Sequence, residues 1–228
     1  MKIGIVVPSI EEIKPIVHFL NPKQKFVSKK LQWYKGEHKG ITYLAVVCGI
    51  GKVNSAAATQ MLIDTFNPDK MLMFGVCGAI DENLDIGDAL ICTSVMHHDF
   101  NEEFLTQNEP VYESCDFLAD KEIISSVKAA INKGNFDFNI FYGRLVTGEA
   151  FIEDNKRDEI QKQFCPYCVD METAAFAQVC VLNEKPFLAI RTVTDTPKKQ
   201  GLSVFRQNLK KASFNVALLA KITLDSLK

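Results

Sequence analysis

The sequence lacks a strong net charge, and this absence narrows its range of partners. Its 228 residues include 26 basic and 28 acidic side chains, which give a formal net charge of −2. Nucleic acids and anionic membrane surfaces attract clustered Lys and Arg, whereas these charges are interspersed. We therefore expect neither nucleic acid nor a membrane as a partner.

Long apolar runs are also missing, since none approaches the roughly 20 residues that cross a bilayer. The apolar opening MKIGIVVPSI is interrupted by Glu11 and Glu12 and has no small-residue cleavage pattern, so we expect no targeting segment. The cysteines number seven, an odd count, and several lie in apolar runs where a thiol packs as a small hydrophobe. These features indicate a reduced, cytoplasmic setting.

Two short motifs lack the context that their chemistry needs. C165-P-Y-C168 follows a charged segment and leads into a strand, whereas a redox CxxC opens a helix. No second CxxC or paired HxxxH stands at zinc-ligand spacing. G49-I-G-K52 has Val46 where a P-loop needs glycine and Val53 where it needs Ser or Thr. The sequence predicts no metal and no cofactor.

What the sequence does contain is an alternation of short β-rich apolar runs with longer helical patterns. Strands are expected at 2–9, 41–50, 70–80, 88–97, 141–152, 167–171 and 186–195, and helices at 11–20, 54–66, 119–134, 155–164, 172–184 and 203–228. This order is typical of an α/β fold with both sheet faces covered. Strand signals crowd together between 84 and 150, and no linker divides the chain. We expect a single α/β domain, residues 1–228, with a central mixed β-sheet flanked by helices.

Acidic residues and glycines recur where the predicted strands end. Glu12, a predicted glycine turn that contains Gly78, the pair Asp170 and Glu172, and Asp195 each follow such a strand. Each alone has an ordinary structural explanation, such as a helix first turn or a strand-ending turn. Open α/β sheets, however, bind ligands outside the carboxyl ends of their strands, so one crevice could collect all of them. Carboxylates there could hold a polyhydroxyl ligand such as a ribose.

At this point the chain resembles the 5′-methylthioadenosine/S-adenosylhomocysteine nucleosidases of the nucleoside phosphorylase superfamily. Each matching motif is weak alone, but their order agrees over nearly the whole chain. The motifs are M1-K-I-G-I with E11-E-I, C48-G-I-G-K-V, G75-V-C-G78, G87-D-A, G148-E-A-F-I152, V169-D-M-E-T-A-A-F-A-Q-V-C180 and R191-T-V-T-D195.

The resemblance implies a hydrolase that cleaves the N-glycosidic bond of 5′-thio-substituted adenosines. Such a reaction needs an acid that protonates the leaving base and a carboxylate that activates water. The matching positions assign the following roles: Asp195 is the acid toward adenine N7, Glu12 the base, Glu172 the ribose ligand, Met171 the contact to the sugar, Phe151 the partner that stacks on adenine, Ile152 the backbone contact to the base edge and Arg191 a support for the water, while Gly78 borders the substrate.

Three positions depart from the family pattern. Val76 stands where the family usually has Ser, Asp170 where it has Glu, and Glu149 where it has Asp. Since acid, base and ribose carboxylate are all present, these changes put substrate preference and rate in question rather than the type of reaction.

Two other functions stay open at the level of sequence: phosphorolysis on the same fold, and nucleoside binding without turnover. The carboxylates in VPSIEEI would repel a phosphate, which favours water. The resemblance also implies a homodimer in which a segment of one subunit closes the neighbour's pocket. The candidate segment is 97–110, with Phe100, Phe104 and Leu105, although these side chains could instead pack beneath their own loop. The preferred 5′ substituent stays open.

Overall fold

The computed structural model describes residues 1–101, 114–153 and 155–227, and it has the expected alternation of strands and helices. The segment expected to close the neighbour's pocket lies largely outside this range, including Phe104 and Leu105. The described helices are α1 (Ile10–Leu20), α2 (Lys52–Phe66), α4 (Lys121–Ile131), α5 (Asn155–Phe164), α6 (Thr173–Leu182) and α7 (Leu202–Ser226). The strands are β1 (Lys2–Val7), β2 (Gln24–Ser28), β3 (Leu31–His38), β4 (Ile41–Val47), β5 (Lys70–Ala79), β6 (Ala89–His97), β7 (Phe117–Leu118), β8 (Ile140–Thr147), β9 (Cys168–Asp170) and β10 (Phe187–Asp195).

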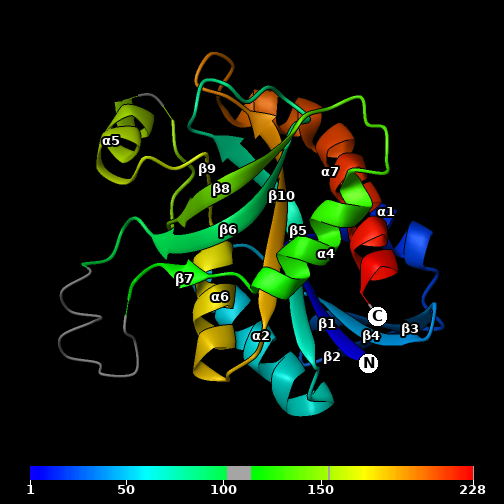
Figure 1. The fold of residues 1–228 in the computed structure, drawn as a ribbon. Helices are drawn as coiled ribbons and strands as arrows, with labels where there is room; N and C mark the ends of the chain where they lie inside the picture. Colours follow the sequence, from blue (N-terminus) through cyan, green and yellow to red (C-terminus); the bar gives the residue numbers. More distant parts are fainter. Residues whose placement is uncertain (102–113, 154, 228) are drawn as a thin grey trace.

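The sheet is mixed, as expected, but part of it also closes on itself. β5 pairs in parallel with β10, β10 antiparallel with β6, β6 in parallel with β8, β8 in parallel with β9, and β9 antiparallel with β5. From this closed part, β1, β4, β3 and β2 extend as an open wing beside β5 (Figure 1). Strand alternation alone did not predict the closure, because it depends on β5 having three neighbours.

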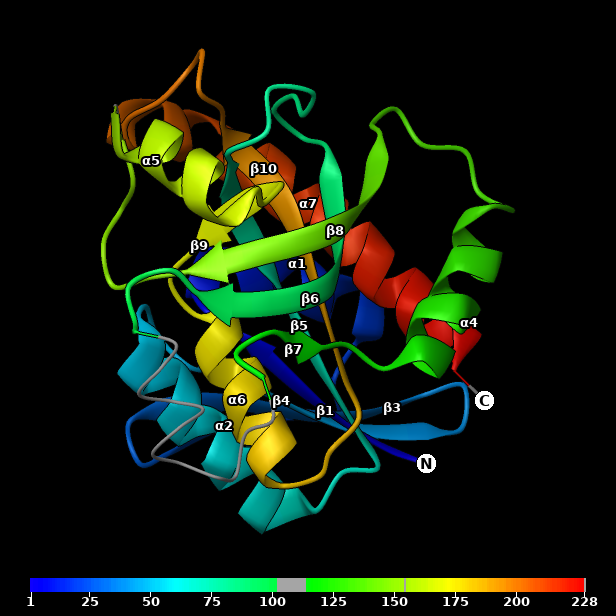
Figure 2. The same ribbon diagram turned by 60° about the vertical axis from the view of Figure 1, so that its left-hand side comes forward.

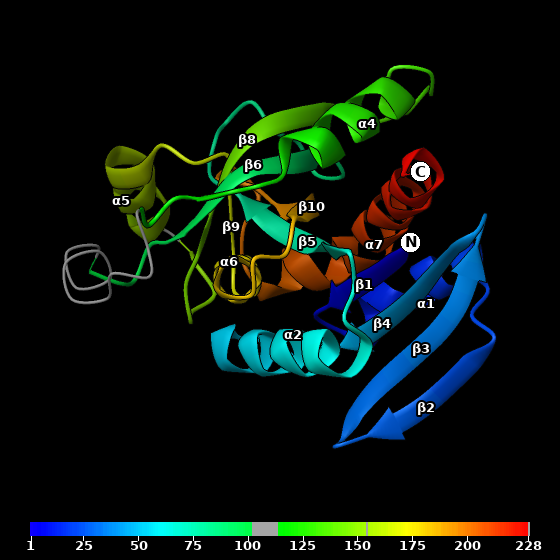
Figure 3. The same ribbon diagram turned by 60° about the horizontal axis from the view of Figure 1, so that its bottom comes forward.

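Helices lie on both faces of the inner part of the wing, with α2 against β1 and β4 and α1 against β3, and on the outside of the closed part (Figure 3). α1 and α7 pack together, and α7 also lies along β10, while α2 packs on α6. The central strands read as near-continuous apolar runs because both of their faces are buried; in β10 every residue is buried. None of the helices in the described part of the chain is long and apolar enough to span a bilayer.

The hairpin β2–β3 and the short strand β7 were not predicted from the sequence. β2 is exposed along its whole length and lies at the sheet edge, so no apolar alternation marks it. The glycine turn expected at 74–79 was wrong, because β5 runs unbroken through these residues to Ala79. Buried charged side chains approach Gly75 and Gly78, as described below, and this explains glycine there better than a turn does.

Candidate active site

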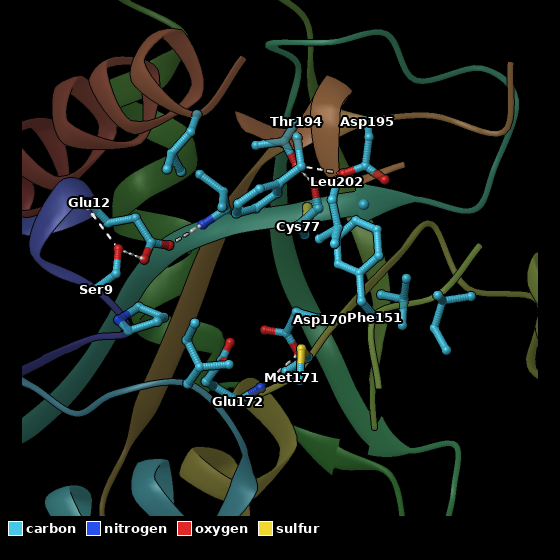
Figure 4. Close-up of a pocket in the computed structure, with 18 of the residues that line it drawn as sticks. Ser9, Glu12, Cys77, Phe151, Asp170, Met171, Glu172, Thr194, Asp195 and Leu202 are labelled. Atoms are coloured by element: carbon cyan, nitrogen blue, oxygen red, sulfur yellow. Dashed lines mark hydrogen bonds between the residues drawn. The ribbon is translucent and has the colours of Figure 1, made fainter. Parts of the chain in front are cut away.

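A cavity of about 330 Å³ opens at the carboxyl ends of β1, β5, β9 and β10. This is where ligands bind in open α/β sheets, and the volume suits a small ligand. Figure 4 shows Glu12 on one side, Asp195 on another, and Met171 with Glu172 on a third. The predicted residues that line it are Glu12, Gly78, Phe151, Ile152, Met171, Glu172 and Asp195; Arg191 does not.

Glu12 reaches the cavity from the first turn of α1, where Ser9 is the N-cap. The Ser9 hydroxyl accepts from the Glu12 backbone N–H at 3.3 Å and donates to Glu12 Oε2 at 2.5 Å. The Val76 backbone N–H donates to Oε1 at 2.8 Å. Burial raises the pKa of Glu12, and the Arg191 charge with the two hydrogen bonds only partly offsets this. Glu12 is therefore a fixed carboxylate whose basicity is enhanced.

A β-bulge places Asp195 at the end of β10. Val193 pairs with Cys77 and Asp195 with Gly78, which leaves Thr194 as the extra residue. The Thr194 hydroxyl donates to Asp195 Oδ1 at 2.6 Å. A Cβ on Gly78 would lie 3.1 Å from Asp195 Oδ2, so glycine leaves room for the carboxylate. Burial raises the pKa of Asp195.

Arg157 of α5 also lines the cavity, although nothing in the sequence pointed to it. It is buried, and its guanidinium donates to Asp195 Oδ2 and to the Ala79 carbonyl. In a charged surface helix such as NKRDEIQKQF, one arginine that turns inward leaves no sequence signal. Among the described residues that line the cavity it is the one cation, beside the carboxylates Glu11, Glu12, Asp170, Glu172 and Asp195.

Asp170 and Glu172 have different tasks, although both line the cavity. Asp170 accepts from the backbone N–H groups of Glu172 and Thr173 at 3.2–3.3 Å, from the Thr147 hydroxyl at 2.5 Å and from the Thr173 hydroxyl, and it pairs with Arg191 at 2.8 Å. These contacts fix the start of α6. Among the described residues, Glu172 accepts from the Gly51 backbone N–H alone, at 2.9 Å, with Arg191 3.9 Å away. Glu172 is thus the carboxylate with capacity left for a ligand.

Arg191 lies behind the carboxylates and is fully buried. Burial lowers its pKa, but the charges of Asp170, Glu172 and Glu12 more than compensate and hold it protonated. A Cβ on Gly75 would lie 2.0 Å from Arg191 Nη1 and 2.7 Å from Glu12 Oε1, so the glycine makes this arrangement possible. The structure therefore places Arg191 as the counter-ion of the cluster rather than in the wall of the cavity.

Apolar side chains complete the walls. Phe151 packs edge-on against Phe205 of α7, with ring centroids 5.9 Å apart. Leu202 and Leu209 of α7 also line the cavity, and sequence reasoning missed all three α7 residues, because they read as the ordinary apolar face of a helix. Ser9 was missed as well, although S9-I-E-E12 has the spacing of a capping box.

The three departures from the family pattern occupy different places. Val76 lines the cavity and holds Glu12 through its backbone N–H. Asp170 is the buried anchor of α6 described above. Glu149 lies outside the cavity wall, where its Oε1 accepts from the Lys52 backbone N–H at 3.0 Å and its own N–H donates to Asp99 at 2.9 Å. Only Val76 therefore changes the cavity surface without a compensating internal partner.

The cysteine pair C165-P-Y-C168 has no shared environment. Cys165 is exposed and Cys168 is buried, and all seven cysteines are free thiols. Cys48, Cys77, Cys92, Cys168 and Cys180 are buried, as expected of thiols that pack as small hydrophobes. Among the described residues, no group of three or more His, Cys, Asp or Glu is placed to hold a metal ion.

Comparison with known proteins places this cavity in context. Residues 2–225 match the model of the phosphorylase superfamily. A 5′-methylthioadenosine/S-adenosylhomocysteine nucleosidase of Pseudoalteromonas translucida is 32% identical over 236 residues, covering 100% of both chains. The nucleosidase of the same name from Neisseria meningitidis, solved with methylthio-immucillin-A, superposes with a TM-score of 0.89 at 28% identity and covers 99% of both chains.

A second solved structure agrees in fold alone. Futalosine hydrolase of Helicobacter pylori has a TM-score of 0.89 but 23% identity, and it covers 98% of its own chain and 100% of this one. These superpositions confirm the predicted nucleoside phosphorylase-like fold, with one domain built on a mixed sheet.

Proposed function

The chain belongs to the 5′-methylthioadenosine/S-adenosylhomocysteine nucleosidases of the phosphorylase superfamily, and we propose that Glu12 and Asp195 carry out their hydrolysis in this cavity. The protein is a hydrolase that cleaves the N-glycosidic bond of 5′-thio-substituted adenosines, releasing adenine and a thioribose. The observation that supports the assignment of roles is the placement of these two acids on different sides of one cavity, with Glu172 on a third side.

In the proposed mechanism the bond between C1′ and N9 breaks and its electron pair moves into the purine. Asp195 gives its proton to N7, which neutralises the leaving base, and its raised pKa favours the protonated form that this step needs. Water attacks C1′ and loses its proton to Glu12. The Ser9 hydroxyl and the Val76 N–H hold Glu12 in its ionised, accepting form. Proton exchange with solvent then returns Asp195 to its protonated form and Glu12 to its ionised form.

The remaining residues bind the two ends of the nucleoside. Glu172 accepts hydrogen bonds from the ribose hydroxyls, with Met171 against the sugar. Phe151 stacks on adenine, while Ile152 offers its backbone to the base edge and Gly78 borders the base beside Asp195. The surplus of carboxylates in the wall also favours the positive charge that develops on the sugar as the bond breaks.

Phosphorolysis is disfavoured by the same charges. A phosphate needs free cationic side chains or bare backbone N–H groups. Arg191 is bound to Asp170 and lies outside the wall, Arg157 is bound to Asp195, and the Val76 N–H is taken by Glu12. Water is therefore the acceptor that this site allows.

The test is a release assay on the purified protein. We expect free adenine from methylthioadenosine and S-adenosylhomocysteine at the same rate with and without phosphate, and no sugar phosphate in phosphate buffer. Adenosine, inosine and 5′-deoxyadenosine in the same panel report the preference at the 5′ position and the base. Binding without base release would instead support the nucleoside-binding alternative.

The homodimer expected from the resemblance is part of this proposal. Ile50 and Val53, at the start of α2, are 61% and 78% exposed, and Phe100 is 49% exposed. Lys52 pairs with Asp99 at 2.7 Å, which brings the α2 start and Phe100 to one region of the surface. Ile50 also lines the cavity, so a second subunit bound there would cover the 5′ end of the nucleoside.

Sedimentation tests the dimer directly. We expect a dimer at micromolar concentration and a monomer for Val53→Glu, with a larger rise in KM for methylthioadenosine than for adenosine, whose hydroxyl gains less from apolar contact. A wild-type monomer would overturn it. The buried thiols are consistent with a cytoplasmic setting, where thiols stay reduced.

A further inference from the structure

Each carboxylate oxygen of Asp195 has a hydrogen-bond partner from its own chain, and one of these partners comes from outside the sheet. Thr194 donates to Oδ1, while Arg157 of α5 donates to Oδ2. Both members of the ion pair are buried, with side chains 3% and 1% exposed. An acid that must protonate a purine has to offer an oxygen to the base, and the guanidinium paired with Oδ2 competes with the base for that position.

Arg157 is built into the cavity wall rather than onto the protein surface. It faces the cavity next to Gly78, where a Cβ would lie 3.2 Å from Nη2, so the glycine makes room for the arginine as well as for Asp195. Its Nε is buried and has no hydrogen-bond partner among the described residues. Arg157 thus donates directly to Asp195, but its Nε–H group lacks an acceptor among the described residues.

The helix that supplies Arg157 has a limited hold on the molecule. Figures 1 and 2 show α5 at the periphery, on the side of β8 and β9. Only Arg157, Ile160 and Phe164 of α5 are buried, and Ile160 and Phe164 belong to a small apolar cluster with Ile152, separate from the main core. Ile152 is also the proposed contact to the base edge, so the purine-binding segment and α5 share one packing unit.

We propose that Arg157 is a positioning residue that stabilises the ionised form of Asp195 until a purine enters, and that the base then takes the place of Arg157 at Oδ2. This inference rests on the proposed function. Once the guanidinium leaves, the buried carboxyl takes up a proton from solvent and can pass it to N7. Substrate binding thereby creates the acid that the reaction consumes.

The electrostatic surroundings of Asp195 leave this role to Arg157. Burial raises the pKa of Asp195 above its ordinary value, and the Thr194 hydrogen bond and the Arg157 charge offset part of this rise. The residues that α7 contributes to the wall are apolar, and those from β5 are Val76, Cys77 and Gly78. The other charged groups of the wall, Glu11, Glu12, Asp170 and Glu172, are carboxylates, which cannot favour the ionised form.

The test is the pH dependence of adenine release by Arg157→Gln. kcat/KM reports the free enzyme and kcat the complex. Removing the arginine raises the pKa of Asp195 in the free enzyme only, so we expect the alkaline limb of kcat/KM to move up by about 1–3 pH units, the range for one close opposite charge. The alkaline limb of kcat should stay in place, and KM should fall because nothing must be displaced.

Two further variants sharpen the test. Lys156→Gln removes the same charge from an exposed neighbour on α5 and should leave both limbs unchanged. Arg157→Lys keeps the charge but loses the forked geometry, so it should shift the kcat/KM limb less and in the same direction. If the glutamine variant fails to fold, the lysine variant decides alone.

The outcomes separate this inference from the function on which it rests. If the wild type releases no adenine, the proposed function fails. If the wild type is active and a folded Arg157→Gln protein keeps the wild-type kcat/KM limb, Arg157 does not control Asp195. Equal shifts of the kcat and kcat/KM limbs would show that Arg157 stays on Asp195 in the complex, which also overturns the proposal.

Discussion

The carboxylate cluster of the cavity and Asp225 near the end of α7 solve the same electrostatic problem in opposite ways. In the cavity, Asp170, Glu172 and Glu12 share one guanidinium, that of Arg191. At the surface, Asp225 has three basic partners to itself: the His38 ring at 2.5 Å, Lys39 at 2.9 Å and Lys221 at 2.8 Å.

The different ratio of basic groups to carboxylates in the two regions moves the pKa values of Glu172 and Asp225 in opposite directions. Burial and the Asp170 charge raise the pKa of Glu172 to about 8, and Arg191 offsets only part of this. Burial also acts on Asp225, but hydrogen bonds from Lys221, His38 and Lys39 outweigh it and hold its pKa well below the usual range. A site that must stabilise positive charge on a sugar keeps an excess of carboxylates, and near neutral pH this reduces the stability of the fold.

The largest expected effect comes from removing a carboxyl group of the cavity. Glu12→Gln and Asp195→Asn should each lower adenine release by about 10²–10⁴-fold, because each removes a proton-transfer group. Glu12→Gln should unfold at a temperature equal to or above that of the wild type, since it removes a buried carboxyl with a raised pKa. Asp195→Asn should unfold at a lower temperature, because it leaves the buried Arg157 without its counter-ion. Steady-state assays and thermal unfolding check both, with Asp225→Asn as an active control. A folded variant with near-full activity would exclude that residue from its role.

The second prediction sharpens the comparison through stability. The pKa of Glu172 rises on folding from 4.5 to about 8, so between these pH values the native state binds more protons than the unfolded state. The contribution of Glu172 to the free energy of unfolding therefore falls as pH rises. Glu172→Gln should stabilise the fold by at least about 1 kcal/mol at pH 9, since one pKa unit corresponds to about 1.36 kcal/mol. The gain should vanish near pH 4.

Thermal unfolding at pH 4, 7 and 9 measures this gain, and adenine release measures what it costs in function. KM should rise in the same variant, because the amide has one oxygen that can accept from the ribose hydroxyls where the carboxyl group has two. A variant less stable than the wild type at pH 9 would show that Arg191 needs Glu172 as well as Asp170, and the comparison would fail.

Whether a residue of the site could be predicted from the sequence depends on the kind of contact that places it there. Glu12, Glu172 and Asp195 could be predicted to meet because strand ends of one sheet edge converge, and apolar runs marked those strands. Arg157 could not, because its inward direction depends on how α5 packs through Ile160 and Phe164. The bulge at Thr194 depends on the register of β10 against β5, which no local pattern encodes.

The glycines of β5 are a second case in which local sequence does not show which groups meet in the fold. A glycine pair after an apolar run is typical of a turn, yet Gly75 and Gly78 lie inside the strand. They are small because Arg191, Glu12, Arg157 and Asp195 approach them from other elements. Local sequence records that a side chain is absent there, but only the assembled fold shows which groups use the space.

A smaller effect is expected on the surface side of the comparison. The pKa of Asp225 is lowered on folding, so its contribution to stability is present above its unfolded pKa near 3.8 and is lost as pH falls through the lower, folded value. Asp225→Asn should destabilise the fold at pH 7 by about 1 kcal/mol at most, because solvent screens this partly exposed side chain. Denaturant titrations at pH 7 and pH 2 should show a smaller difference at pH 2. A loss of stability in Asp225→Asn that is larger at pH 2 than at pH 7 would contradict a pKa of Asp225 that is lowered on folding.

The smallest effect tests whether the three basic partners of Asp225 are redundant, as the comparison requires. Lys221→Met removes the partner one helical turn away and leaves His38 and Lys39 in contact with Asp225. Since an exposed i,i+4 pair contributes about 0.3–0.5 kcal/mol, the loss should be of this order and should shrink further in 1 M salt, where charges are screened within about 3 Å. In a double-mutant cycle with Asp225→Asn, the coupling energy should account for most of it. If Lys221→Met instead destabilises as much as Asp225→Asn, one cation holds this carboxylate just as Arg191 holds the cavity, and the contrast between the two regions must come from burial alone.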